Sequence, residues 1–214
     1  LDGDDVYWLE GRPHEGGRNA LVKRAADGTI ADVTPRDHNV RTRVHEYGGG
    51  AYVVSDGDVY YSNFADQRIY RIAGSAPRDP AYVRGAGSAQ VDPPEPITPE
   101  GNWFYADATI DARRRRLICV REDHTRAGLE PATTLVSIPL SRQPAAGSRQ
   151  PAARAGQVIA SGYDFYSTPR LSPDGSRLAW LAWRHPQMPW DGTELWVADV
   201  TDAGLLARPA LVAG

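Results

Sequence analysis

The 214-residue sequence predicts an all-β fold of the β-propeller class, with about four four-stranded blades. The first observation is an internal repeat: ADATIDARRRRLICV (106–120) superposes on STPRLSPDGSRLAWL (167–181), about 60 positions further along. Second, the Asp-Gly pairs Asp2-Gly3, Asp56-Gly57 and Asp174-Gly175, which supply the positive φ angles of tight hairpins, sit at the same place in three of the four units. Third, no sustained 3.6-residue apolar stripe predicts a long helix.

Each unit reads as four short apolar or alternating segments with turn residues between them. The expected blades are 1–45, 46–102, 103–162 and 163–214, and the first of them lacks a pattern for its own first strand. A β-sandwich is the rival all-β architecture. It does not predict two units of about 60 residues that superpose strand by strand.

Two segments do not read as strands. Residues 74–96 are rich in Pro, Gly, Ala and Ser, and residues 141–156 contain the duplication SRQPAAG, SRQPAAR. Such compositions bury too little apolar area to offset the entropy of ordering. We therefore expect surface loops, inserted between the third and fourth strands of their units.

The bulk composition narrows the class of function. A net charge of −3, from 24 basic and 27 acidic side chains, gives no basic excess for nucleic-acid binding. No run approaches the roughly 18 apolar residues of a membrane span. The single cysteine, Cys119, excludes an internal disulfide and a multi-cysteine zinc site, and its place in RRLICVRED predicts a buried apolar role. We expect no metal, no cofactor and no nucleic-acid or membrane partner, and a cytoplasmic location.

The stretch RTRVHEYGGGAY (41–52) combines a histidine, a glutamate and a tyrosine with three glycines. A phosphate-binding loop would need a helix after the glycines, and the following AYVVSDGDVYYS reads as strand, turn, strand. The glycines are expected instead to let a strand pass close to neighbouring backbone.

Unusual side chains gather in the loops that precede each first strand or join second to third strands, which open on one face of a propeller. The opposite turns, such as ARRR, look plain. The substrate-binding candidates are His45, Glu46, Tyr47, Glu15, Glu122, Asp123 and Glu194. Glu46 either pairs with Arg41 or Arg43 or stays free to bind an amine. Packing remains the alternative for the aromatic residues, and surface or packing roles for the histidines.

No catalytic motif is present. The sequence has no GxSxG nucleophile elbow, no dinucleotide-binding glycine fingerprint and no HExxH. By its own chemistry the chain is a binding or gating module, and a stand-alone propeller that binds proteins or acts as a scaffold stays open as an alternative.

Several loops together resemble a known family. EGRPHEGGR, RTRVHEYGGGAY, SNFADQRIYR, REDH and HPQMPWDGTELWVADV are similar to the N-terminal propeller of the prolyl oligopeptidase family, in its bacterial acylaminoacyl-peptidase-like and dipeptidyl-aminopeptidase-like branch. The resemblance runs from Asp2 to about Val200. RVHEYGGG and HPQMPWDGTELW are its most specific parts, whereas SPDG is common to many propellers.

The resemblance implies a propeller of seven blades that caps an α/β-hydrolase domain with a Ser-Asp-His triad. That domain would be the partner of this chain, and no catalytic residue is expected within residues 1–214. The propeller would restrict access by size and orient short peptides or aminoacyl compounds. In this reading Glu46, beside Tyr47, grips a free substrate amine, as in an aminopeptidase, and Glu15, Glu122, Asp123 and Glu194 are weaker candidates.

Overall fold

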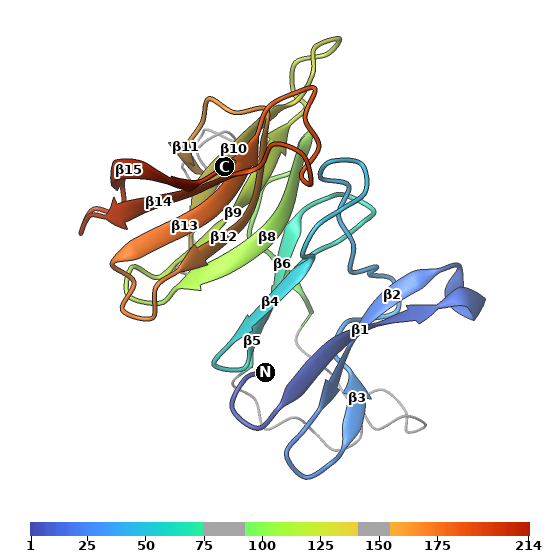
Figure 1. Cartoon of the computed structure of the whole chain (residues 1–214). Helices are drawn as coiled ribbons and strands as arrows, with labels where there is room; N and C mark the ends of the chain where they lie inside the picture. Colours follow the sequence, from blue (N-terminus) through green and yellow to red (C-terminus); the bar gives the residue numbers. More distant parts are fainter. Residues whose placement is uncertain (75–92, 141–154) are drawn as a thin grey trace, which may run out of the picture.

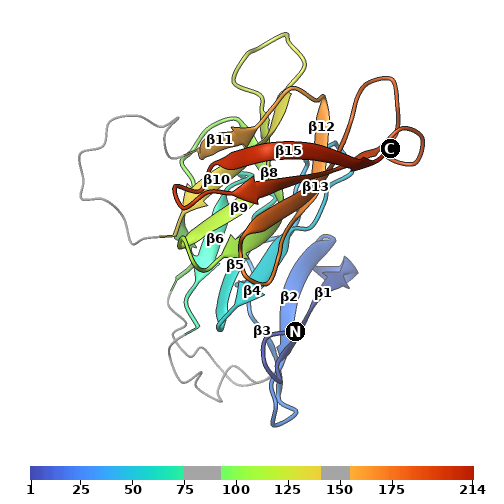
Figure 2. The same ribbon diagram turned by 60° about the vertical axis from the view of Figure 1, so that its left-hand side comes forward.

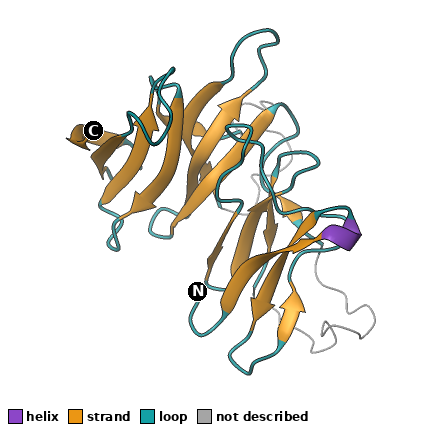
Figure 3. Ribbon diagram, turned by 45° about the vertical axis from the view of Figure 1, so that its right-hand side comes forward, coloured by secondary structure: helices purple, strands orange, loops and turns teal. Residues whose placement is uncertain are grey.

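A computed structural model of the chain describes residues 1–74, 93–140 and 155–214. They form four antiparallel sheets that follow one another through space in chain order (Figures 1 and 2). The helical content of the described residues is a single 3₁₀ turn, η1 (Pro13–Glu15), drawn in purple in Figure 3. The expected all-β propeller architecture is confirmed.

The first sheet has three strands and the other three sheets have four each. The first contains β1 (Val6–Arg12), β2 (Arg18–Arg24) and β3 (Ile30–Asp32). The second contains β4 (Tyr52–Ser55), β5 (Asp58–Ser62), β6 (Ile69–Ile72) and β7 (Glu95–Pro96). The third contains β8 (Trp103–Asp111), β9 (Arg116–Asp123), β10 (Ala132–Pro139) and β11 (Gln157–Ala160). The fourth contains β12 (Phe165–Leu171), β13 (Arg177–Trp183), β14 (Glu194–Val200) and β15 (Leu206–Ala213).

Within each sheet, strands that are consecutive in the sequence pair as neighbours, as in a meander. Each sheet lies inside one of the four expected units, and the first sheet lacks the strand for which the sequence had no pattern. Most of the two low-complexity segments falls outside the described residues. The end of the first of them forms β7, where Glu95 and Pro96 pair with Arg71 and Tyr70.

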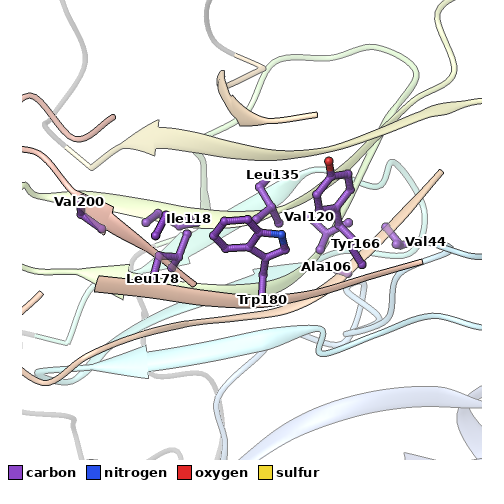
Figure 4. Packing of buried hydrophobic residues seen from close by; sticks show 11 residues of the cluster. Val44, Ala106, Ile118, Val120, Leu135, Tyr166, Leu178, Trp180 and Val200 are labelled. Atoms are coloured by element: carbon purple, nitrogen blue, oxygen red, sulfur yellow. The ribbon is translucent and has the colours of Figure 1, made fainter. Parts of the chain in front are cut away.

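In the part of the chain that the structure describes, the core consists of three apolar clusters, each between two neighbouring sheets. Figure 4 shows the cluster between the third and fourth sheets, in which Trp180 of β13 packs toward Leu135 and Ile118. The Trp180 ring stacks on Trp196 of β14 with centroids 6.5 Å apart. The free energy gained by burying apolar side chains is roughly proportional to the area removed from water. Since these clusters lie between sheets, each sheet is stabilised mainly by packing against its neighbours. Cys119 is fully buried, as expected.

The repeat extends to an irregularity of the backbone. β8 and β12 each carry a β-bulge, between Ala106 and Thr109 and between Ser167 and Arg170. The first residue inside each bulge, Asp107 in β8 and Thr168 in β12, has a positive φ angle, of 55° and 52°. A bulge changes the direction in which a side chain leaves the strand. The side chains of Asp107 and Thr168, at equivalent positions of two blades, are therefore redirected by the same irregularity.

No helix among the described residues is long and apolar enough to cross a membrane.

Candidate functional site at the 44–50 turn

The segment from Val44 to Gly50, here called the 44–50 turn, lies near the end of the connection from β3 to β4. It is closed by hydrogen bonds from Glu46 N to Arg43 O (2.8 Å) and from Gly48 N to Val44 O (2.8 Å). His45 and Glu46 both adopt left-handed backbone, with φ angles of 55° and 62°. Such a conformation costs a non-glycine residue about 1–3 kcal/mol and persists only where the surroundings enforce it.

Glu122, at the end of β9, is one part of those surroundings. Its Oε1 accepts a hydrogen bond of 2.7 Å from the backbone N–H of His45, and its Oε2 lies 3.0 Å from Nε2 of His124. The carboxylate is buried, since Glu122 is only 4% exposed. The His124 ring in turn packs against Phe104 of β8, with ring centroids 4.2 Å apart. The third sheet thus holds a turn that lies 77 residues earlier in the chain.

The imidazole of His45 is a second anchor. It lies among three aromatic rings, with centroid distances of 5.7 Å to Tyr47, 5.5 Å to Phe165 and 5.4 Å to Trp183. Burial lowers the pKa of His45, against the opposing influence of the Glu122 and Asp107 carboxylates. His45 is therefore a neutral packing group at pH 7, and its Nε2 has no hydrogen-bond partner among the described residues.

The glycines are needed because the carboxylate of Asp107 approaches them closely. A Cβ on Gly49 or on Gly50 would lie 3.0 Å from Asp107 Oδ1. That oxygen accepts a hydrogen bond of 2.6 Å from Gly50 N, while Oδ2 accepts one of 3.0 Å from Thr168 N. Asp107 therefore links the residues that lead into β4 to the bulges of β8 and β12. The backbone of β8 also approaches closely, since Asp107 N donates a hydrogen bond of 2.8 Å to Gly50 O, so the expectation of close backbone approach is confirmed.

Sequence reasoning missed Asp107. The available signal was the repeat, which places Asp107 and Thr168 at equivalent positions. The contact from Asp107 to Gly50 could not be predicted from either position alone.

Glu46 is exposed, and its carboxylate forms no ion pair with any described residue. Of the two alternatives, pairing with Arg41 or Arg43 is not what the structure has. Both guanidinium groups lie over the ring of Phe64 instead, 4.9 Å and 4.6 Å from its centroid. Tyr47, next to Glu46, is 63% exposed, and burial and then the carboxylates of Asp107 and Glu122 raise its pKa.

Three of the other predicted carboxylates are engaged elsewhere. Glu15 pairs with Arg18 at 2.6 Å, and that hydrogen bond lowers its pKa. Glu194 accepts hydrogen bonds from the Tyr163 hydroxyl and, at 2.8 Å, from Trp196 Nε1, and its pKa is lowered, chiefly by the first bond.

Asp123 accepts hydrogen bonds from Thr125 N (3.0 Å) and Oγ1 (2.6 Å). Burial acts to raise the pKa of Asp123, but these bonds lower it. The structure therefore brings together His45, Glu46, Tyr47 and Glu122, and does not place Glu15 or Glu194 among the contacts of the turn.

The turns at the other end of the strands are not plain, contrary to the expectation for ARRR. Asp111, with a side chain 1% exposed, accepts hydrogen bonds from Arg116 Nε (2.8 Å) and Arg114 Nη1 (3.1 Å). The same two arginines donate to the carbonyl groups of Gly204 and Gly175, in two turns between strands of the fourth sheet. This network connects two blades, and the sequence alone gave no sign of it because its acceptors are backbone carbonyls.

Among the described residues no group of three or more His, Cys, Asp or Glu is placed to hold a metal ion. The 44–50 turn offers a carboxylate, Glu46, that no described cation pairs with, beside the exposed phenol of Tyr47, on a backbone held by Glu122. Such an arrangement can bind a cation such as an ammonium group by charge and by hydrogen bonds.

No protein-family model and no curated protein matches the sequence. Solved structures do match. A crystal structure of puromycin hydrolase is 33% identical, with a TM-score of 0.81, and the match covers 100% of this chain and 32% of that one. A second crystal structure, of a variant of puromycin hydrolase complexed with PGG, matches with the same values.

A Mycobacterium tuberculosis puromycin-hydrolyzing peptidase is 35% identical, with a TM-score of 0.78, over 99% of this chain and 31% of that one. This chain therefore spans about a third of the length of these proteins. TolB from Acinetobacter baumannii, 14% identical with a TM-score of 0.50, shares the fold alone.

Proposed function

We propose that this chain, a β-propeller portion of the prolyl oligopeptidase family, admits and orients short peptides or aminoacyl compounds for a serine peptidase domain that lies outside residues 1–214. The contribution is indirect: the propeller excludes large substrates and holds small ones for attack. Support comes from the similarity to two puromycin-hydrolysing enzymes along nearly the whole chain.

The observation that carries the proposal is the exposed carboxylate of Glu46, which forms no ion pair with any described residue and lies on a strained turn that Glu122 holds. Left-handed backbone at a non-glycine residue is costly, so a side chain kept there is a functional candidate. We infer that Glu46 binds the free α-amine of the substrate, with Tyr47 at its side. In a mouth closed by a second domain, this contact would contribute about 1.5–3 kcal/mol, which favours free-amine substrates by roughly ten- to a hundred-fold.

The test is Glu46→Gln in the full-length parent protein. Puromycin suits the assay because it is an aminoacyl compound with a free amine. An N-blocked aminoacyl chromogenic ester is the comparison substrate, since it lacks the free amine. We expect kcat/KM for puromycin to fall at least about tenfold and kcat/KM for the blocked substrate to stay unchanged.

Glu95→Gln is the matched control, since Glu95 is exposed on β7, the edge strand of the second sheet, and not in the loops that carry the candidate residues. Equal losses on both substrates, or no loss, would remove Glu46 from the substrate-binding site. A full-length protein with no hydrolase activity on either substrate would favour the stand-alone binding module instead.

A further inference from the structure

We propose that Glu122 is a positioning residue: it fixes the 44–50 turn so that the Glu46 carboxylate is presented to the substrate, without touching the substrate itself. The inference rests on the proposed role of Glu46 and extends it to a residue of another blade. Sequence reasoning had placed Glu122 among the weaker substrate-binding candidates, and the structure gives its carboxylate a different neighbourhood.

Both oxygens of Glu122 are engaged inside the molecule. One accepts the His45 N–H at 2.7 Å, and the other lies 3.0 Å from His124 Nε2. At 4% exposure the carboxylate is too buried to meet a substrate amine. The adjacent cation, Arg121, points elsewhere and donates to the carbonyl groups of Ala155 and Gly156. The charge of Glu122 is thus directed at the 44–50 turn.

The N–H that Glu122 accepts belongs to the first of two consecutive left-handed residues. His45 and Glu46 carry side chains that resist this backbone, whereas glycine adopts it freely, as Gly48 does two residues after Glu46 with a φ angle of 92°. A turn needed only for chain reversal would relax by moving the strain onto glycine. A buried acceptor that holds His45 prevents this and keeps the Glu46 side chain where it is exposed.

His124 holds Glu122 in place, and Val44 holds the start of the 44–50 turn. The His124 ring lies against Phe104, which keeps Glu122 pointing at His45. Val44, 1% exposed, is anchored in the cluster between the third and fourth sheets, so the start of the turn cannot drift. The carboxylate of Glu122 then sets the direction in which the chain leaves Val44.

The test compares Glu122→Ala, Glu122→Asp and Glu122→Gln in the full-length protein. Alanine removes the acceptor and aspartate withdraws it by one methylene, whereas the amide oxygen of glutamine can still accept the His45 N–H. We expect KM for puromycin to rise about fivefold to tenfold in the Ala variant, less in the Asp variant and least in the Gln variant. The value of kcat, and kcat/KM on the N-blocked substrate, should be nearly unchanged.

A readout that needs no activity is amide hydrogen exchange. We expect the His45 amide to be protected in the wild-type and Gln proteins and to exchange at least about tenfold faster in the Ala variant, with the amides of β9 and β10 unaffected. If Glu122→Ala does not fold, Glu122→Asp carries the same comparison. Unchanged exchange at His45, or equal losses on both substrates, would overturn the inference.

The Glu46→Gln, Glu122→Ala double variant separates this inference from the proposed function. If Glu122 acts through Glu46, the second substitution adds little to the loss already caused by Glu46→Gln. If Glu46→Gln alone has no effect on the choice between the two substrates, the role of Glu46 fails. If Glu46→Gln has its effect but Glu122→Ala does not, the positioning role alone fails.

Discussion

The two ends of β9 use the same kinds of charge for opposite purposes. At the Arg116 end, two arginines converge on the buried carboxylate of Asp111, and their remaining donors reach backbone carbonyls of the next blade. At the Glu122 end, a buried carboxylate holds a backbone turn, and a different carboxylate, Glu46, is left exposed without a cation among the described residues. The first arrangement joins blades, whereas the second keeps a charge available.

The pKa values follow the same division. Burial acts to raise the pKa of Asp111, but hydrogen bonds from Arg116 and Arg114 outweigh it and lower the pKa. At the 44–50 turn the chief effect is desolvation, which keeps His45 neutral. At one end of β9 the charge of Asp111 is thus neutralised by neighbouring arginines. At the other end the charge of Glu46 stays exposed, on a backbone that is strained at His45 and Glu46.

The largest effect should come from breaking the Arg116 end. Asp111→Ala leaves two largely buried guanidinium groups without their carboxylate, and losing one partner of a buried ion pair costs about 3–5 kcal/mol. We expect the thermal midpoint of the propeller to fall by on the order of 10 °C in the full-length protein.

Asp202→Ala is the control for this comparison. Asp202 pairs with Arg113 at the same end, but both side chains are exposed, at 92% and 58%. Exposed pairs contribute at most about 1 kcal/mol, so its midpoint should barely move. Similar midpoints for the two variants would show that the Asp111 network does not join the blades as described.

The second effect, of intermediate size, concerns the packing behind the 44–50 turn. Gly49→Ala would place a Cβ 3.0 Å from both Ala106 Cβ and Asp107 Oδ1, and Asp107 cannot move away without losing its bonds to Gly50 and Thr168. We expect a loss of about 1–3 kcal/mol in the free energy of unfolding, measured by thermal or urea unfolding. Gly11→Ala in β1, whose nearest neighbour would lie at 3.8 Å, should be nearly neutral.

The smallest effect should be a pH dependence. Burial lowers the pKa of His45 below its usual 6.5, so the unfolded chain binds the proton more readily than the folded chain. The contribution of neutral His45 to stability is therefore present above about pH 6.5 and is lost as the pH falls below that value. His45→Asn tolerates the left-handed backbone and removes the titrating group.

Thermal midpoints between pH 7.5 and pH 5 provide the measurement. The wild-type protein should lose more stability over this range than His45→Asn, by about 1 kcal/mol or less. The matched variant His14→Asn, at an exposed position, should follow the wild-type profile. Identical pH profiles for His45→Asn and the wild type would mean that burial does not shift this histidine.

The sequence alone predicted the blades, because the repeat, the alternation of apolar residues and the Asp-Gly turns are local features with a period that can be read directly. The Asp56-Gly57 hairpin illustrates this, since both residues have the positive φ angles that the pair predicts. The sequence also singled out Glu46 and Tyr47 by composition, as unusual residues beside a glycine run. It could not decide whether Glu46 was paired with an arginine.

Tertiary structure alone decided the roles of Glu122, Asp107 and Asp111. Glu122 and Asp107 accept hydrogen bonds from backbone N–H groups of other segments, and Asp111 holds two arginines that donate to backbone carbonyls of the next blade. Every residue type has the same backbone groups, so the sequence does not show which of them will be bonded. A carboxylate stabilises the fold if folding brings hydrogen-bond donors from distant segments to within about 3 Å of its oxygens, and otherwise it is available to a ligand. In this protein, Glu122 lies within that distance of the His45 N–H and is buried. Glu46, the residue after His45, has no such partner among the described residues and is exposed.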